Sequence, residues 1–288
     1  MSQVQGSTNP GSLALSDLRG YEARERTPVC AAYERWRVCG VPPPSAGGIA
    51  IAQILGTLQA LEARDSRWSL AKLPPIPAPT LAGAEPRPEA VHLIAEADRL
   101  AYADRGFYVA DPDFVPVDVA GLTDRDYIAQ RARLISERSL GKAPPGVLRG
   151  ATLSLAPDRS PMRTSTSQVV AVDDSGGAVS MTTTVEHAFG SHLMVEGFVL
   201  NNQLTDFSFI PREGGGKLVA NRVEAGKRLP WRWLDVRRTA LTLMSSWRAY
   251  SANWTLPARA NRRRGDELSC PPDPRGRGRF RATLNKVY

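Results

Sequence analysis

The residues best suited to chemistry are threonines at the two ends of a β-rich stretch, TSTSQVVAVDDSGGAVSMTTTVEHAFGS (164–191). Two apolar runs, QVVAV and AVSMTTTV, flank the turn signal DDSGG, which predicts a β-hairpin. If the turn centres on Ser175, Thr166 faces Thr184 at the open end of the hairpin. One of two facing hydroxyls could orient the other, and a plain cross-strand threonine pair at the rim of a sheet is the alternative.

A threonine hydroxyl is a poor nucleophile unless a base accepts its proton, and a threonine at the start of a chain supplies that base through its own α-amine. Here this would require cleavage between Ser165 and Thr166. The preceding segment, Gly141 to Met162, is rich in Pro, Gly and Ser and predicts a mobile linker that could reach the site. On composition alone, Thr164 or Ser167 would serve as well.

The elements that must position these residues are mostly helices. The apolar spacing predicts a short helix at LSDLRGY, a strand at YERWRVCG, and longer helices over about 49–63 and at PEAVHLIAEADRLAYADR. Thr123 is expected to cap a third helix, with Asp126 in a capping-box-like position. VPPPSAGG predicts a rigid loop with glycines for a close turn, and 73–88 an irregular, proline-rich connector. The expected core positions are Ile51, Ile54, Leu55, Leu58 and Leu61 in the first long helix and Val91, Ile94, Ala97, Leu100 and Ala101 in the second.

The cysteines and histidines indicate no metal centre, because their spacing matches no zinc site. Cys30 and Cys39 flank AAYERWRV, which could place them on neighbouring strands, and two buried thiols are favoured over a disulfide. No apolar run is long enough to span a bilayer, and MSQVQGSTNP lacks the pattern of a secretory signal.

The net charge of +8 comes from the end of the chain. Residues 229–288 hold twelve arginines and one lysine against four acids, whereas the first 228 residues hold 24 basic and 25 acidic residues. The same tail holds four of the six tryptophans. Its RRR and RGRGRFR runs are typical of Arg/Gly segments that bind nucleic acid or an acidic surface.

The hairpin stretch TSQVVAVDDSGGAVSMTTTVEHAFGS, followed by FVLNNQLTDFS, resembles the start of the small subunit of γ-glutamyltransferases (glutathione hydrolases). These are N-terminal-nucleophile hydrolases that cleave themselves before a threonine. Upstream, LSDLRGYEARERTPVC, VCGVPPPSAGGIAIAQILG, EAVHLIAEADRLAYADR and YVADPDFVPV resemble the C-terminal part of the large subunit. The resemblance runs from about Asn9 to Arg228.

The resemblance implies an α+β fold that forms part of the αββα sandwich of N-terminal-nucleophile hydrolases. Residues 1–165 would be a helical large-subunit remnant ending in the linker, 166–228 the β-rich start of the small subunit, and 229–288 a basic tail not native to the fold. Sheet edges left open by missing strands would favour aggregation.

The resemblance also assigns roles to residues. Thr166 matches the nucleophile, and Thr184 matches the threonine that supports its hydroxyl. Glu186 stands where the family contacts the α-amino group of the substrate, and Gln203 and Asp206 match residues that hold the same end. Carboxylates and an amide oxygen suit a buried ammonium, although a turn-capping carboxylate is the alternative for Asp206.

The implied reaction is acyl transfer without a cofactor. Thr166 would attack the γ-carbonyl of glutathione or another γ-glutamyl amide, and water, an amino acid or a peptide would accept the acyl group from the ester. The two fragments would stay together as a heterodimer after self-cleavage of the zymogen. Family members sit in the periplasm or outside the cell, whereas a chain without a signal would stay in the cytoplasm.

Two departures from the family pattern bear on activity. The arginine that binds the substrate's α-carboxylate, expected in the first half of the large subunit, has no match. After Arg228 the Ser-Ser pair and the Gly-Gly oxyanion segment are replaced by LPWRWLDVRR, as a reading-frame shift would produce. Because losing one oxyanion donor costs about a hundred- to a thousandfold in rate, an inactive remnant is one alternative function, and a basic-tail binding protein is another.

Overall fold

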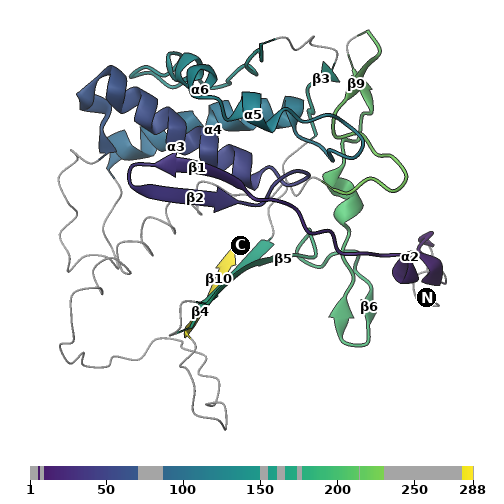
Figure 1. Ribbon diagram of the computed structural model, residues 1–288. Helices are drawn as coiled ribbons and strands as arrows, with labels where there is room; N and C mark the ends of the chain where they lie inside the picture. Colours follow the sequence, from purple (N-terminus) through teal and green to yellow (C-terminus); the bar gives the residue numbers. More distant parts are fainter. Residues whose placement is uncertain are drawn as a thin grey trace, which may run out of the picture. The chain divides into compact units, whose positions relative to one another are not determined.

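The computed structural model describes residues 6, 10–70, 87–149, 155–160, 166–173, 177–213, 215–229 and 281–287 (Figure 1). The chain divides into two compact units. The helical unit comprises Glu25–Pro161 and Thr205–Arg248, and the hairpin unit comprises Met1–Arg24, Met162–Leu204 and Ala249–Tyr288.

The helical unit is built around α3 (Gly47–Arg64), which packs against α4 (Pro88–Tyr108), α6 (Arg125–Ala132) and the hairpin of β1 (Val29–Tyr33) and β2 (Trp36–Gly40) (Figure 1). The turn η1 (Ser66–Trp68) follows α3, and α5 (Val119–Leu122) precedes α6. Both long helices confirm the apolar spacing in the sequence. The core between them is made of Ile54, Leu58 and Leu61 from α3 and Leu93, Ala97, Leu100 and Ala101 from α4.

Some expected core positions are wrong. Val91 is 43% exposed because it lies in the first turn of α4, and Ile51 and Leu55 are only partly buried. In their place α3 buries Gln53 and Thr57. The Gln53 amide donates to Asp104 at 3.1 Å and to the Leu122 carbonyl at 2.9 Å, and these bonds offset the cost of burying it.

The expected cap at Thr123 is also wrong. Asp124 is the N-cap of α6, and its side chain accepts the Tyr127 amide at 3.0 Å. Thr123 instead ends α5, where its hydroxyl donates to the Val119 carbonyl at 2.8 Å. Threonine and aspartate are both good N-caps, so the sequence alone did not distinguish Thr123 from the next residue, Asp124.

Cys30 and Cys39 form a disulfide, which corrects the expectation of two buried thiols. The predicted strand is the second arm of a hairpin, in which Cys30 and Cys39 are direct cross-strand partners with Cα atoms 4.0 Å apart. Cys39 is exposed, so burial would not protect its sulfur from oxidation in the reduced chain. The turn into α3 matches the expected role of its glycines, because a Cβ on Gly48 would lie 2.8 Å from the Val41 carbonyl oxygen.

A small sheet in the helical unit carries the linker. β3 (Leu155–Ala156) pairs in parallel with β9 (Lys217–Val219), which pairs antiparallel with β8 (Arg212–Glu213). Val219 and Ala220 are fully buried, as is Phe207 just after the 3-10 turn η4 (Gln203–Asp206). Part of the predicted linker, Leu155–Ala156, is therefore a strand of this sheet.

The hairpin unit contains α2 (Leu15–Arg19), the short hairpin of β6 (Met194–Val195) and β7 (Phe198–Val199), and a sheet in the order β10-β4-β5. β4 (Thr166–Val172) and β5 (Ala178–Thr183) pair from Ser167↔Thr183 to Val172↔Ala178. This register confirms the predicted one, and the predicted turn at 174–176 lies outside the described residues. β10 (Arg281–Val287) comes from the basic tail and pairs antiparallel with β4, so β4 is a central strand.

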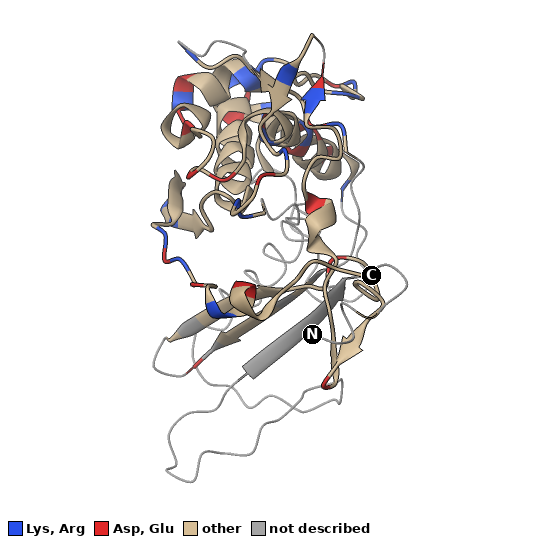
Figure 2. Ribbon diagram, turned by 90° about the vertical axis from the view of Figure 1, so that its right-hand side faces the viewer, with Lys and Arg blue, Asp and Glu red and all other residues tan. Residues whose placement is uncertain are grey.

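The architecture is α+β. The described sheets have two or three strands each, so the four-layer sandwich stays a prediction. Basic and acidic residues are interspersed over the helices of the helical unit (Figure 2). Within the described ranges, no helix has both the length and the apolar character needed to cross a bilayer, and no three His, Cys, Asp or Glu side chains cluster as metal ligands.

Candidate functional site

The two threonines of interest lie at the open end of the β4–β5 hairpin. Thr166 is the first residue of β4, and Thr184 directly follows β5. Continuing the ladder by one pair beyond Ser167↔Thr183 brings Thr166 opposite Thr184. Of Thr166 only the backbone is described, and Ser165, the other half of the predicted cleavage site, lies outside the described residues. The place of the Thr166 hydroxyl therefore stays a prediction.

Thr184 shapes the backbone of the residue predicted to bind substrate. Its hydroxyl oxygen accepts the Glu186 amide at 2.8 Å. Glu186 has a φ of 72°, in the left-handed region that costs a non-glycine residue about 1–3 kcal/mol. A hydroxyl that accepts one hydrogen bond can still donate one, so this contact is compatible with a second role for Thr184.

Glu186 is the most unusual charged residue of this region. Its side chain belongs to a residue that is only 1% exposed, and neither carboxylate oxygen accepts a hydrogen bond from any residue that the structure describes. Acidic side chains are seldom fully buried without a partner, because removing the charge from water is costly. A cationic group of a ligand would compensate this charge.

Asn202 brings the segment of Gln203 beside the segment of Glu186. The Asn202 amide donates to the Val185 carbonyl at 3.2 Å, and its side-chain oxygen accepts the His187 amide at 3.0 Å. The backbone on both sides of Glu186 is thus tied to Asn202. Asn202 was not among the residues predicted from the sequence, although it lies in the same NNQLTDF motif as Gln203.

Gln203 and Asp206 are the first and last residues of η4. Gln203 is half-buried and belongs to the hairpin unit, whereas Asp206 is 1% exposed and belongs to the helical unit. The structure thus brings Thr184, Glu186 and Gln203 together within the hairpin unit. It places Asp206 in the helical unit, where the Asn221 amide donates to its carbonyl at 2.8 Å.

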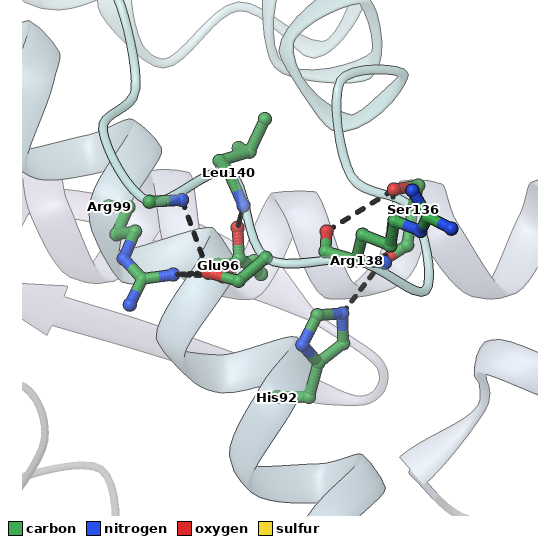
Figure 3. A network of polar contacts seen from close by, with 8 residues as sticks. His92, Glu96, Arg99, Ser136, Arg138 and Leu140 are labelled. Atoms are coloured by element: carbon green, nitrogen blue, oxygen red, sulfur yellow. Dashed lines mark hydrogen bonds and ion pairs between the residues drawn. The ribbon is translucent and has the colours of Figure 1, made fainter.

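Side chains of α4 hold the chain that leads toward the linker. The Glu96 carboxylate accepts from Arg99, from the Ser139 hydroxyl at 2.9 Å and from the Leu140 amide at 2.9 Å (Figure 3). One turn earlier, the His92 ring lies 2.7 Å from the Ser136 carbonyl oxygen (Figure 3). These contacts fix residues 136–140 on the helix.

Asp104, further along α4, fixes the beginning of the predicted linker. Its carboxylate accepts the Gly146 amide and the Tyr127 hydroxyl, each at 2.7 Å, and lies 3.1 Å from the Arg131 guanidinium. Burial raises the pKa of Asp104, although Arg131 and the hydrogen bonds act in the opposite direction. Burial and the neighbouring Asp104 charge likewise raise the pKa of Tyr127.

The chain is similar to known proteins over most of the described region. The family model described as gamma-glutamyltranspeptidase matches residues 2–231. The glutathione hydrolase proenzyme of Escherichia coli (strain K12) is 35% identical over 208 residues, which are 70% of this chain and 31% of that protein. The corresponding proenzyme of Bacillus subtilis (strain 168) is 34% identical over 230 residues, 76% of this chain and 35% of that protein.

Among solved structures, the cephalosporin acylase from Bacillus halodurans has a similar fold, with a TM-score of 0.53 at 22% identity over 76% of this chain and 33% of that one. The chain spans about a third of the length of the curated relatives that it matches. The end of the family match at residue 231 lies close to Arg228, where the sequence departs from the family pattern.

Proposed function

The chain belongs to the gamma-glutamyltranspeptidase family, and from this premise we propose that it cleaves γ-glutamyl amides such as glutathione through an ester on Thr166. Its relatives are named glutathione hydrolase proenzymes, which suggests maturation by cleavage. We infer that the cleaved bond is the one between Ser165 and Thr166.

The observation that carries the proposal is the hairpin register, which would bring the start of β4 opposite Thr184 if it continued by one pair beyond Ser167↔Thr183. It agrees with an N-terminal threonine whose hydroxyl is supported by a second threonine from the facing strand. The buried carboxylate of Glu186, two residues further on, supports the same assignment because no residue that the structure describes supplies a cationic partner for it. The α-ammonium of a γ-glutamyl group would provide that cation, with Gln203 and Asp206 holding the same end of the substrate.

The reaction follows from these roles. The Thr166 α-amine accepts the proton of its own hydroxyl, and the oxygen attacks the γ-carbonyl carbon of the donor. The bond from this carbon to the leaving nitrogen breaks, and the departing amine takes the proton. Water then attacks the γ-glutamyl ester and regenerates the threonine; an amino acid or peptide amine in place of water gives transfer. No step calls for a cofactor.

The proposal extends to partners and location. The two fragments would stay associated as a heterodimer. We place the protein in the periplasm or outside the cell, because the Cys30–Cys39 disulfide is typical of an oxidising compartment. No described feature favours a nucleic-acid function of the basic tail, in which residues 281–287 form a strand of the sheet.

The test combines a denaturing gel, N-terminal sequencing and hydrolysis of a γ-glutamyl anilide. We expect two fragments, the smaller beginning Thr-Ser-Gln-Val, and release of the anilide product. Thr166→Ala should leave a single band and no product, whereas the control Ser180→Ala, opposite Val170 in the middle of the hairpin, should be cleaved like the unsubstituted chain. An intact band without product from the unsubstituted chain would favour an inactive remnant, and fragments with any other first residue would contradict the assignment.

A further inference from the structure

Asn221, two residues after β9, contacts the chain at Asp206 and at Ser208. It is 5% exposed, and its side-chain amide donates to the Asp206 carbonyl at 2.8 Å. Its backbone carbonyl accepts the Ser208 amide at 2.9 Å. The backbone from Asp206 to Ser208 is therefore held at two points by a single residue.

The same side chain also reaches the linker. The Asn221 amide nitrogen donates to the Asp158 carboxylate at 3.2 Å. Both partners of this nitrogen are acceptors, so a reversed amide would set its oxygen against a carbonyl and a carboxylate. The side-chain oxygen has no hydrogen-bond partner within the described ranges, a cost of about 1–3 kcal/mol that the two donated bonds must offset.

Asp158 is itself well fixed. Its backbone amide donates to the Gly106 carbonyl of α4 at 2.8 Å, and the preceding residues form β3 on β9. The next residue, Arg159, pairs with Glu213 at 3.0 Å. Asn221 thus connects a linker segment anchored on α4 with the turn that carries Asp206.

We propose that Asn221 is a positioning residue for donor binding: it sets the backbone of Asp206 and makes that setting depend on the docked linker residue Asp158. The proposal rests on the function proposed above, in which Asp206 holds the ammonium end of the donor. Asn221 itself acts only through Asp206. Since the linker precedes the predicted cleavage point, the chain upstream of the nucleophile helps to shape the substrate-binding turn.

The first readout is hydrogen exchange followed by mass spectrometry on the full chain, over residues 205–211. Asn221→Leu keeps the branching of the side chain and the backbone carbonyl but removes both donated bonds. We expect exchange in this segment to become about tenfold faster, as the loss of a buried hydrogen bond predicts. Asp158→Ala should produce a smaller increase of the same kind and Asp158→Asn little change, because its amide oxygen can still accept.

The matched control is Ser160→Ala. This change removes a different linker contact, the bond from the Phe209 amide to the Ser160 hydroxyl at 3.1 Å, and leaves Asn221 untouched. It should not raise the KM for the donor. If Asn221→Leu does not fold, the Asp158 pair alone decides the question.

The second readout is γ-glutamyl anilide hydrolysis. Asn221→Leu should raise KM about tenfold and change kcat less than threefold, because it loosens donor binding and spares Thr166. Unchanged exchange over 205–211 would overturn the proposal, as would an unchanged KM in an active enzyme. If the unsubstituted chain shows no hydrolysis, the proposed function fails, and the exchange experiment still decides whether Asn221 sets Asp206.

Discussion

Replacing Asp104 by alanine should destabilise the helical unit by about 3 kcal/mol. Four donors converge on this buried carboxylate, and two of them keep other partners. Gln53 retains the Leu122 carbonyl, and Arg131 retains the carbonyls of Leu100 and Pro144. The Gly146 amide and the Tyr127 hydroxyl lose the one acceptor that the structure shows for each.

The magnitude follows from these two groups. A buried donor left without a partner costs about 1–3 kcal/mol, and two of them cost about 2–6 kcal/mol. Removing a carboxylate that is itself poorly solvated offsets part of this loss, as the raised pKa of Asp104 indicates. The expected net loss of about 3 kcal/mol is a large fraction of the free energy of unfolding of a whole domain.

The assay is urea unfolding of the full chain, followed by circular dichroism at the helical band. The matched control is Asp126→Ala on α6, whose side chain is 82% exposed and lies 3.9 Å from Arg149. This control should change stability by less than about 0.5 kcal/mol. A loss below about 1 kcal/mol for Asp104→Ala would refute the reasoning, because it would mean that water satisfies both donors.

Three further predictions concern pH, the disulfide and the substrate site. The folded-state pKa of Asp104 is raised above its ordinary value of 3.8, so its contribution to the free energy of unfolding is present below pH 3.8 and is lost as the pH rises through the folded-state pKa. Asp104→Asn should therefore have a free energy of unfolding, measured in urea, that compares more favourably with that of the unsubstituted chain at pH 7 than at pH 4. A difference between the two chains that stays constant with pH would contradict this. Reducing Cys30–Cys39, which are nine residues apart, should cost about 2–3 kcal/mol of stability from released loop entropy; unfolding curves with and without dithiothreitol measure it, and the double Ser variant should be indifferent to the reductant. Glu186→Gln should lower kcat/KM for a γ-glutamyl anilide about thirtyfold or more, by the loss of a buried charge pair with the ammonium; an effect below threefold would remove Glu186 from the site.

Local patterns predicted much of this structure. The helices α3 and α4 follow from apolar spacing alone, and the hairpin register follows from the turn DDSGG. The pattern failed where a polar side chain is buried by a distant partner. Gln53 is polar in sequence, and two acceptors on other elements, the Asp104 carboxylate and the Leu122 carbonyl, allow it to be a core residue.

The residues of the candidate site were likewise predictable only where the sequence carries a local signal. Thr166, Thr184 and Glu186 stand out because they lie within one hairpin and its continuation. Asn202 and Asn221 carry no local signal, since an asparagine in a loop is ordinary and its role depends on which backbone segment lies beside it. The spacing of Cys30 and Cys39 indicated neighbouring strands. It did not show that the two residues are direct cross-strand partners.

The Cys30–Cys39 disulfide also determines in which kind of host the protein should be produced. Cys39 lies on the surface, so a chain made in a reducing host would present a free thiol to its neighbours. Such material would form covalent dimers on exposure to air, visible as a doubled mass on a gel run without reductant. Secretion through an oxidising compartment should give chains in which the Cys30–Cys39 bond is already formed and Cys270 is the one cysteine outside it.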